Sequence, residues 1–353
     1  MIEIWYGIVS FMMLTYVVLD GRNFGAGILH FFVARTQEER RQVVAAIGPL
    51  WVWHEVWIVG FGGTLFVAFP KLLAASFSGY YLALFLVLWC FAFRGGALEA
   101  GGHIDDKMWR SFWDVVFTVS NYLLAILFGA ALGNLSRGVP VDDSGTFSMA
   151  FFTNFSPFGS PSGHVGLLDW YTVSMGVVVL IVLGAHGATY LAMRTVGPVH
   201  DRSARYMRVL WTLVPVAVVV IAIETWFVRP ALLAAFFGQP LAWVFALVVL
   251  VGAGMIFTGI RGRDDRRCFL GSGAVVIGML AAGAATIYPV ILYSTLDPKD
   301  SLTAQNTAAS ERSLELAMLW WPVAGGLAFG YLWYIARYFS GKVDVKAGDA
   351  GPY

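Results

Sequence analysis

Long apolar stretches alternate with short polar links along the whole chain. A stretch of roughly 18–25 apolar residues is long enough to cross the hydrocarbon core of a bilayer as a helix. Nine such stretches occur, at about residues 5–31, 48–70, 76–94, 112–134, 167–193, 207–228, 239–260, 269–293 and 316–338. The pattern predicts an all-α integral membrane protein with about nine transmembrane helices, in which residues 1–353 form a single membrane domain.

The composition supports this class of protein. Hydrophobic residues make up 58% of the chain and charged residues only 13%, whereas about 25% of a soluble domain is charged. The net charge of +1 gives no reason to expect a nucleic-acid partner. Two cysteines cannot build a disulfide framework, so we expect Cys90 and Cys268 to be free thiols. The first residues lack the pattern of a secretory signal, and the first helix is expected to stay in the protein.

The distribution of basic residues predicts the orientation of the helices. Links after the odd-numbered helices and the C-terminal end hold 17 of the 23 Lys and Arg residues: Arg35, Arg40, Arg41, Arg94, Lys107, Arg110, Arg194, Arg202, Arg205, Arg208, Arg261, Arg263, Arg266, Arg267, Arg337, Lys342 and Lys346. The opposite links hold five: Lys71, Arg137, Arg229, Lys299 and Arg312. Because cytoplasmic links are rich in Lys and Arg, we expect the N-terminus outside and the C-terminus in the cytoplasm. The two long links, 135–166 and 294–315, are then external loops.

Ionisable residues interrupt the first apolar stretch. Asp20, Arg22 and Asn23 lie within it, although a charged side chain inside a bilayer is costly. Arg22 is some eleven residues from the cytoplasmic end of the helix, or roughly 16 Å at 1.5 Å per residue, which is too deep to reach the interface easily. We therefore expect a carboxylate partner on another helix. The candidates are Glu55, Glu99 and Asp114. Gly21 and Gly25 are expected to form a small face against which a neighbouring helix packs closely.

The second apolar stretch begins with a polar motif. Trp51, His54 and Glu55 follow the i, i+3, i+4 spacing and share one face of a helix. A histidine beside a carboxylate near the cytoplasmic end suits proton uptake, since both groups can titrate near neutral pH once buried. A hydrogen-bonded structural pair among interfacial tryptophans is an equally good interpretation.

The other histidines carry weaker signals. His30, His103, His164 and His200 are expected to be solvated, because they lie at helix ends or in a loop. His186 lies inside the fifth predicted helix, where it either forms a hydrogen bond between helices or contacts a heme, a quinone or a proton path. No spacing of His, Cys, Asp or Glu predicts a metal site.

Four sequence elements occur in a distinctive order. They are residues 20–28 (DGRNFGAGI), residues 48–70 with Gly48-Pro49, Trp51, Glu55-Val56-Trp57, Gly62-Gly63 and Phe69-Pro70, residues 187–195 (GATYLAMRT), and residues 301–310 (SLTAQNTAAS) followed by 341–343 (GKV). They resemble the elements DGFDxGxG, GPxWDGNEVW…GGAxFAAFP, GATYLxxRT and SLTxxNAASS…GKV of subunit II of the cytochrome bd quinol oxidases. The resemblance runs nearly end to end.

The resemblance implies a subunit of a quinol:oxygen oxidoreductase in the bacterial cytoplasmic (inner) membrane, which reduces dioxygen to water with cytoplasmic protons. It implies two four-helix bundles plus one peripheral helix. Heme b and heme d-type groups are implied in a partner, subunit I, with none ligated by this chain. Further implied partners are quinol, lipid, a bound quinone and small single-helix accessory subunits. Trp51 and Trp57 match family positions and are expected at an oxygen path or the subunit interface.

Departures from the family pattern concern proton movement. Family aspartates assigned to proton movement align with Asn23 and Val52, and neither residue can release a proton. Arg22 replaces an aromatic residue and His54 replaces an asparagine. A proton path through this chain is therefore expected to use other groups. These are Glu55, His54, Asp20, Arg22 and Glu99.

Alternative functions come from other classes. The chain could be a purely structural membrane scaffold that conducts no protons. It could instead be a heme- or quinone-binding electron carrier, for which His54 and His186 are the candidate axial ligands. A transporter would be expected to show Gly/Pro-broken spans in related halves, which the sequence lacks.

Overall fold

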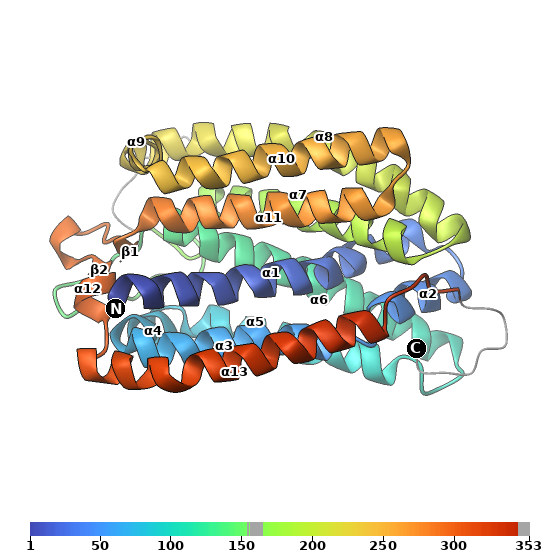
Figure 1. Ribbon diagram of the computed structural model, residues 1–353, viewed down its shortest axis with the longest axis horizontal. Coiled ribbons are helices and arrows are strands. Elements are labelled where there is room, and N and C mark those ends of the chain that lie inside the picture. Colours follow the sequence, from blue (N-terminus) through green and yellow to red (C-terminus); the bar gives the residue numbers. More distant parts are fainter. Residues whose placement is uncertain (154, 156–164, 345–353) are drawn as a thin grey trace.

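The structure, a computed structural model, describes residues 1–153, 155 and 165–344. Within these residues nine long helices run along the length of the molecule (Figure 1): α1 (Ile2–Val33), α3 (Trp51–Ala68), α5 (Tyr81–Ala100), α6 (Lys107–Arg137), α7 (Trp170–Arg194), α8 (Gly197–Val228), α10 (Pro240–Gly262), α11 (Asp265–Ile287) and α13 (Glu311–Tyr338). Eight of them are long and apolar enough to span a membrane alone, and α3 passes the same test together with α2 (Gln37–Ile47), which precedes it at a bend of 45°. The prediction of about nine transmembrane helices is confirmed.

Short elements gather at the two ends of the long helices. One end, which we call the α12 end, carries α4 (Pro70–Gly79), α9 (Pro230–Gly238), α12 (Ala304–Thr307), the 3-10 turn Pro298–Asp300 and the antiparallel strands β1 (Val290–Leu292) and β2 (Leu302–Thr303) (Figure 1). The opposite end, the α2 end, carries α2. There Val343 of the C-terminal segment forms a β-bridge with Thr195.

The sequence pattern placed two boundaries wrongly. The apolar stretch at 269–293 is not one helix, because α11 ends at Ile287 and β1 follows. The stretch at 76–94 was expected to begin a span, but α4 continues to Gly79 and α5 begins at Tyr81. In both cases the residues are apolar enough for a helix, so hydropathy alone could not place the break.

The long helices form two bundles and one peripheral helix. The first bundle consists of α1, α3, α5 and α6, and the second bundle consists of α7, α8, α10 and α11. α7 joins the bundles through contacts with α1 and α6, while α13 packs along α3 at the edge of the molecule (Figure 1). Only 6% of the apolar stretch of α13 is buried, against 72% of that of α7. The expected arrangement of two four-helix bundles with one peripheral helix is confirmed.

Glycines allow α1 and α7 to touch backbone to backbone. A methyl group built on Gly25 would lie 2.6 Å from the Cα atom of Gly187, and one built on Gly187 would lie 2.4 Å from the Cα atom of Gly25. Any larger side chain would therefore separate the two helices. The small face predicted for Gly21 and Gly25 forms this contact, with Gly21 against Leu183.

Candidate functional site

Three charged residues from three helices meet inside the first bundle. Nη2 of Arg94 in α5 donates to both carboxylate oxygens of Asp20 in α1, at 3.1 and 2.8 Å. The same nitrogen donates to Oε1 of Glu55 in α3. The side chains of Arg94 and Asp20 are 1% and 0% exposed, whereas that of Glu55 is 24% exposed. Because a buried charge is stable only when it is paired, Arg94 neutralises a carboxylate that has no access to solvent.

A polar chain extends from this cluster along α1 and α3. Nδ2 of Asn23 donates to Oδ1 of Asp20 at 2.8 Å and also lies 2.8 Å from Nδ1 of His54. Nη2 of Arg22 lies 2.6 Å from Nε2 of His54. The contacts therefore run without interruption from Arg22 through His54, Asn23 and Asp20 to Arg94 and Glu55. The fully buried His54 lies between Arg22 and Asn23 in this series of contacts.

Helical spacing explains why these side chains meet. Asp20 and Asn23 are three residues apart on α1 and share a face. On α3, Trp51 and His54 are buried on the same side, as predicted, while Val52 is 46% exposed on the outer surface. Val52, which stands where the family pattern has an aspartate, thus points away from the polar chain.

The prediction that Arg22 pairs with a carboxylate on another helix was wrong. Among the described residues no carboxylate forms an ion pair with it, and its guanidinium contacts His54 and lies 4.7 Å from the centre of the Tyr190 ring. Glu55 pairs with Arg94 instead. Arg94 had been counted with a cytoplasmic link, but it is buried within α5. The sequence could not reveal this pairing, because the three partners come from three different helices.

The predictions for the remaining histidines met different outcomes. His30 is not solvated: it is fully buried, with Nε2 at 2.8 Å from Oδ1 of Asp114 in α6, and Arg40 binds the other oxygen of that carboxylate at 3.0 Å. His103 is exposed. His200 is partly buried between Asp201 and Asp265, each at 3.0 Å. His164 lies outside the described residues.

His186 forms a hydrogen bond between helices. Its Nδ1 lies 2.8 Å from Oγ of Ser272 in α11, and its Nε2 lies 3.0 Å from the carbonyl oxygen of Val18 in α1. Its ring is stacked on Phe269. Both ring nitrogens of His186 and of His54 have protein partners, so neither ring offers a free nitrogen to a heme iron. The two residues do not fit the axial ligands of an electron carrier.

Other predicted site residues lie around the cluster. Trp51 packs in the core with Leu98 and Phe117. Trp57 is 6% exposed and its ring lies 4.7 Å from that of Phe329, so it fills the contact between α3 and α13. Glu99 is exposed near the end of α5. Cys90 and Cys268 are free thiols, as predicted, and both are buried.

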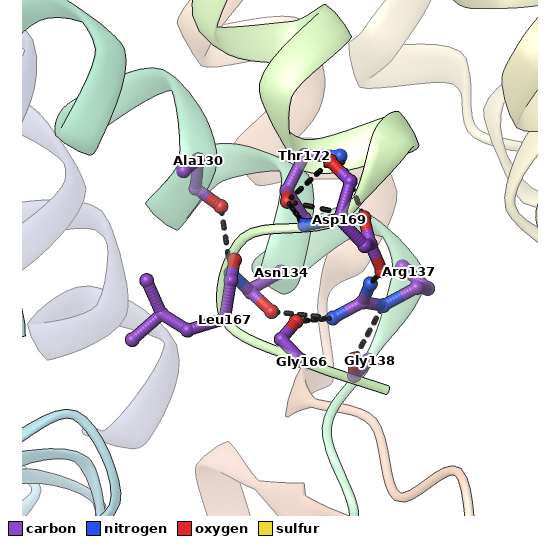
Figure 2. A network of polar contacts seen from close by, with 8 residues as sticks. All are labelled: Ala130, Asn134, Arg137, Gly138, Gly166, Leu167, Asp169 and Thr172. Carbon is purple, nitrogen blue, oxygen red and sulfur yellow. Dashed lines mark hydrogen bonds and ion pairs between the residues drawn. The ribbon is translucent and has the colours of Figure 1, made fainter. Parts of the chain in front are cut away.

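A second buried ion pair, which the sequence did not suggest, joins α6 to α7 at the α12 end. Arg137, the last residue of α6, forms an ion pair with Asp169, the N-cap of α7 (Figure 2). Its guanidinium also donates to Oδ1 of Asn134 at 2.5 Å and to the carbonyl oxygen of Gly166 at 3.0 Å. Because these acceptors satisfy the guanidinium, this cluster fixes the connection between the two bundles rather than offering a binding site.

The family model described as cytochrome bd terminal oxidase subunit II matches residues 1–339. "Cytochrome bd-I ubiquinol oxidase subunit 2" of Escherichia coli (strain K12) is 29% identical over 349 residues, which cover 90% of this chain and 88% of that protein. "Probable cytochrome oxidase subunit 2" of Haemophilus influenzae is 27% identical over 378 residues, with 98% and 96% covered.

A solved structure shares the fold. A chain of the bd oxidase from Geobacillus thermodenitrificans superimposes with a TM-score of 0.74 at 15% sequence identity, covering 96% of this chain and 98% of that chain. Together with the family match over residues 1–339, this agrees with the resemblance seen in the four sequence elements. The chain belongs to the cytochrome bd terminal oxidase subunit II family and is a subunit of a quinol oxidase.

Proposed function

We propose that this chain supports a heme-bearing subunit I in the bacterial cytoplasmic membrane and that its buried polar chain delivers cytoplasmic protons to that subunit. The observation that carries the proposal is the unbroken series of contacts from Arg22 to Glu55. Asp20, His54 and Glu55 can each hold a proton. Charged groups inside a membrane are costly and commonly mark proton relays.

Glu55 is the group that would pass protons out of this chain. Its carboxyl is bound to Arg94 on one side and is 24% exposed on the other. The outer surface of α3 around it is apolar, with Val52 and Val56 46% and 52% exposed. A carboxylate that opens onto an apolar surface suits transfer to a neighbouring membrane subunit better than transfer to water.

The hemes are proposed to lie in subunit I. Heme b and heme d-type groups would supply electron transfer and oxygen reduction when bound there. The two buried histidines considered as ligands in this chain, His54 and His186, already use both ring nitrogens in contacts with protein groups. By resemblance to the family, the complex would also bind quinol and small accessory subunits, and a path for oxygen would pass beside Trp57.

The test is substitution of Glu55 in the purified two-subunit complex. Glu55→Gln keeps the shape of the side chain but cannot carry a proton, so oxygen reduction should fall roughly tenfold or more while the heme spectra stay unchanged. Glu224→Gln is the matched control, because Glu224 is also a membrane carboxylate, bonded to Ser174 in the second bundle at 3.0 Å. This variant should keep wild-type turnover.

The competing function is a scaffold that conducts no protons. It is favoured by Asn23 and Val52, which stand where the family pattern has aspartates. If Glu55→Gln, His54→Ala and the double variant all turn over at the wild-type rate, protons reach the hemes without this chain and the scaffold function is correct.

A further inference from the structure

The contacts around His54 cannot all be hydrogen bonds at the same time. Nη2 of Arg22 lies 2.6 Å from one ring nitrogen, and Nδ2 of Asn23 lies 2.8 Å from the other. Guanidinium and amide nitrogens only donate. A neutral imidazole keeps a proton on one nitrogen and can accept at the other alone, and an imidazolium accepts at neither. One of the two contacts must therefore be reversed or broken.

Asn23 is the group that can reverse. Its Nδ2 also lies 2.8 Å from Oδ1 of Asp20, and its own Oδ1 is buried without a partner. Turning the amide over brings Oδ1 toward both His54 and Asp20. His54 then donates from Nδ1 to Asn23 and accepts from Arg22 at Nε2. Two oxygens would now meet between Asn23 and Asp20, which is stable only if Asp20 carries a proton and donates it.

The opposite arrangement belongs to ionised Asp20. The Asn23 amide then donates to Asp20 and to Nδ1 of His54, whose proton moves to Nε2 and faces Arg22. Arg22 must withdraw from the ring, and the face of Tyr190, 4.7 Å from its guanidinium carbon, provides an alternative contact. The hydrogen bonds from Asn23 to Asp20 and from Arg22 to His54 consequently exclude each other.

Each orientation of the Asn23 amide leaves one of its two polar groups without a partner, so this loss favours neither arrangement. With the amide as it stands, its oxygen is without a partner; once it turns over, the NH2 group occupies that place instead. Leaving a buried polar group unpaired is unfavourable to a similar extent in either case. The balance is therefore set by the proton on Asp20.

We propose that Asn23 is a positioning residue whose side-chain amide turns over when Asp20 gains or loses a proton, which makes or breaks the contact between Arg22 and His54. The inference rests on the proposed proton route and assigns it a step made by a residue that cannot itself carry a proton.

Titratable and charged groups of three helices surround Asp20. The groups that face Asp20 are Arg94 from α5, Glu55 and His54 from α3, and Tyr16 and Arg22 from α1. With both carboxylates ionised the two arginines balance them, and a proton on Asp20 adds one positive charge. Glu55 is bound to the same Arg94 nitrogen as Asp20 and is therefore placed to receive that proton.

Infrared difference spectroscopy on the purified two-subunit complex tests the coupling. Histidine labelled with ¹⁵N reports which ring nitrogen of His54 holds the proton, and the carboxylic acid band lost in Asp20→Asn reports protonation of Asp20. As pH is lowered in the wild type, the His54 proton should move from Nε2 to Nδ1 with the same midpoint as the Asp20 band. In Asn23→Leu the two signals should no longer share a midpoint, or the His54 signal should not change.

Asn121→Leu is the matched control. Asn121 is a buried asparagine of α6 in the same bundle, with its Oδ1 unpaired and its Nδ2 bonded to the carbonyl oxygen of Phe117 at 2.7 Å. This variant should keep the shared midpoint. An unchanged His54 tautomer in the wild type, the absence of an Asp20 acid band, or a shared midpoint that survives in Asn23→Leu would each overturn the inference. These spectra do not depend on turnover. Wild-type oxygen reduction by Glu55→Gln, His54→Ala and their double variant would therefore refute the proton route without deciding the Asn23 coupling.

Discussion

At the scale of single residues, the polar chain shows what an apolar sequence reveals and what it hides. Asp20, Arg22, His54 and Glu55 were identified because ionisable residues stand out in apolar stretches, and the structure connects all four. Arg94 was missed because it lies near the end of an apolar stretch, where an arginine commonly reaches the interface. Its partners are 74 and 39 positions away in the chain, and only the packing of three helices brings them together.

Arg94 should be essential for the stability of the first bundle. Removing one partner of a buried ion pair commonly costs about 3–5 kcal/mol, because the other charge stays buried and unpaired. Arg94→Gln should therefore lower the thermal unfolding temperature of the complex strongly. Adding Asp20→Asn should restore much of the loss, since an amide in place of the buried carboxylate needs no counter-charge. The guanidinium carbon of Arg94 also lies 4.7 Å from the centre of the Phe24 ring and 5.2 Å from that of Phe91. A double variant no more stable than Arg94→Gln alone would show that Arg94 acts through packing on these rings instead of through charge.

At the scale of helices, hydropathy predicted the spans well because a membrane leaves few alternatives. Only a helix satisfies every backbone N–H and C=O group within its own segment, so an apolar stretch of sufficient length has one stable form. The short elements were not predicted, because hydropathy identifies only segments long enough to span the membrane. α4 and α9 are too short to span, and each begins with a proline directly after a long helix, where proline suits the first helical turn.

The contact between α1 and α7 should be sensitive to any added side chain. Gly25→Ala or Gly187→Ala places a methyl group well inside van der Waals distance of the opposite backbone, and overpacking of this kind commonly costs about 1–3 kcal/mol. Gly254→Ala in α10 is the control, since nothing lies within 4 Å of its added methyl. Thermal unfolding of the complex measures both. Equal stability of all three variants would mean that the bundles are not held together at this contact.

At the scale of the whole molecule, hydropathy predicted the number of helices but not their neighbours. The arrangement in two bundles followed from the resemblance to a family, since no pattern in the sequence states that α1 packs on α7 or that α13 stays at the edge. The structure supplies physical reasons for both. Gly25 and Gly187 permit the central contact, and the buried pair of Arg137 and Asp169 fixes the connection between the bundles (Figure 2). α13 exposes large apolar side chains, among them Leu319, Val323 and Leu327, so few of its residues are needed for packing within this chain.

The orientation of the molecule in the membrane is a prediction that rests on charge alone. With Arg94 removed from the 17 residues counted on the cytoplasmic side, 16 remain against five, so the inference is unchanged: the α2 end faces the cytoplasm and the α12 end faces outward. Single cysteines at Asp143, in the link between α6 and α7, or at Gln305, in α12, should react with an impermeant thiol reagent in intact cells, because both positions are exposed. Cysteines at Asp201, near the start of α8, or at Gly262, the last residue of α10, are also exposed and should react only after the membrane is opened. Cys90 and Cys268 are buried and should give little background. Labelling at Asp201 and Gly262 in intact cells would invert the topology, and the proposed proton route would then open to the wrong side of the membrane.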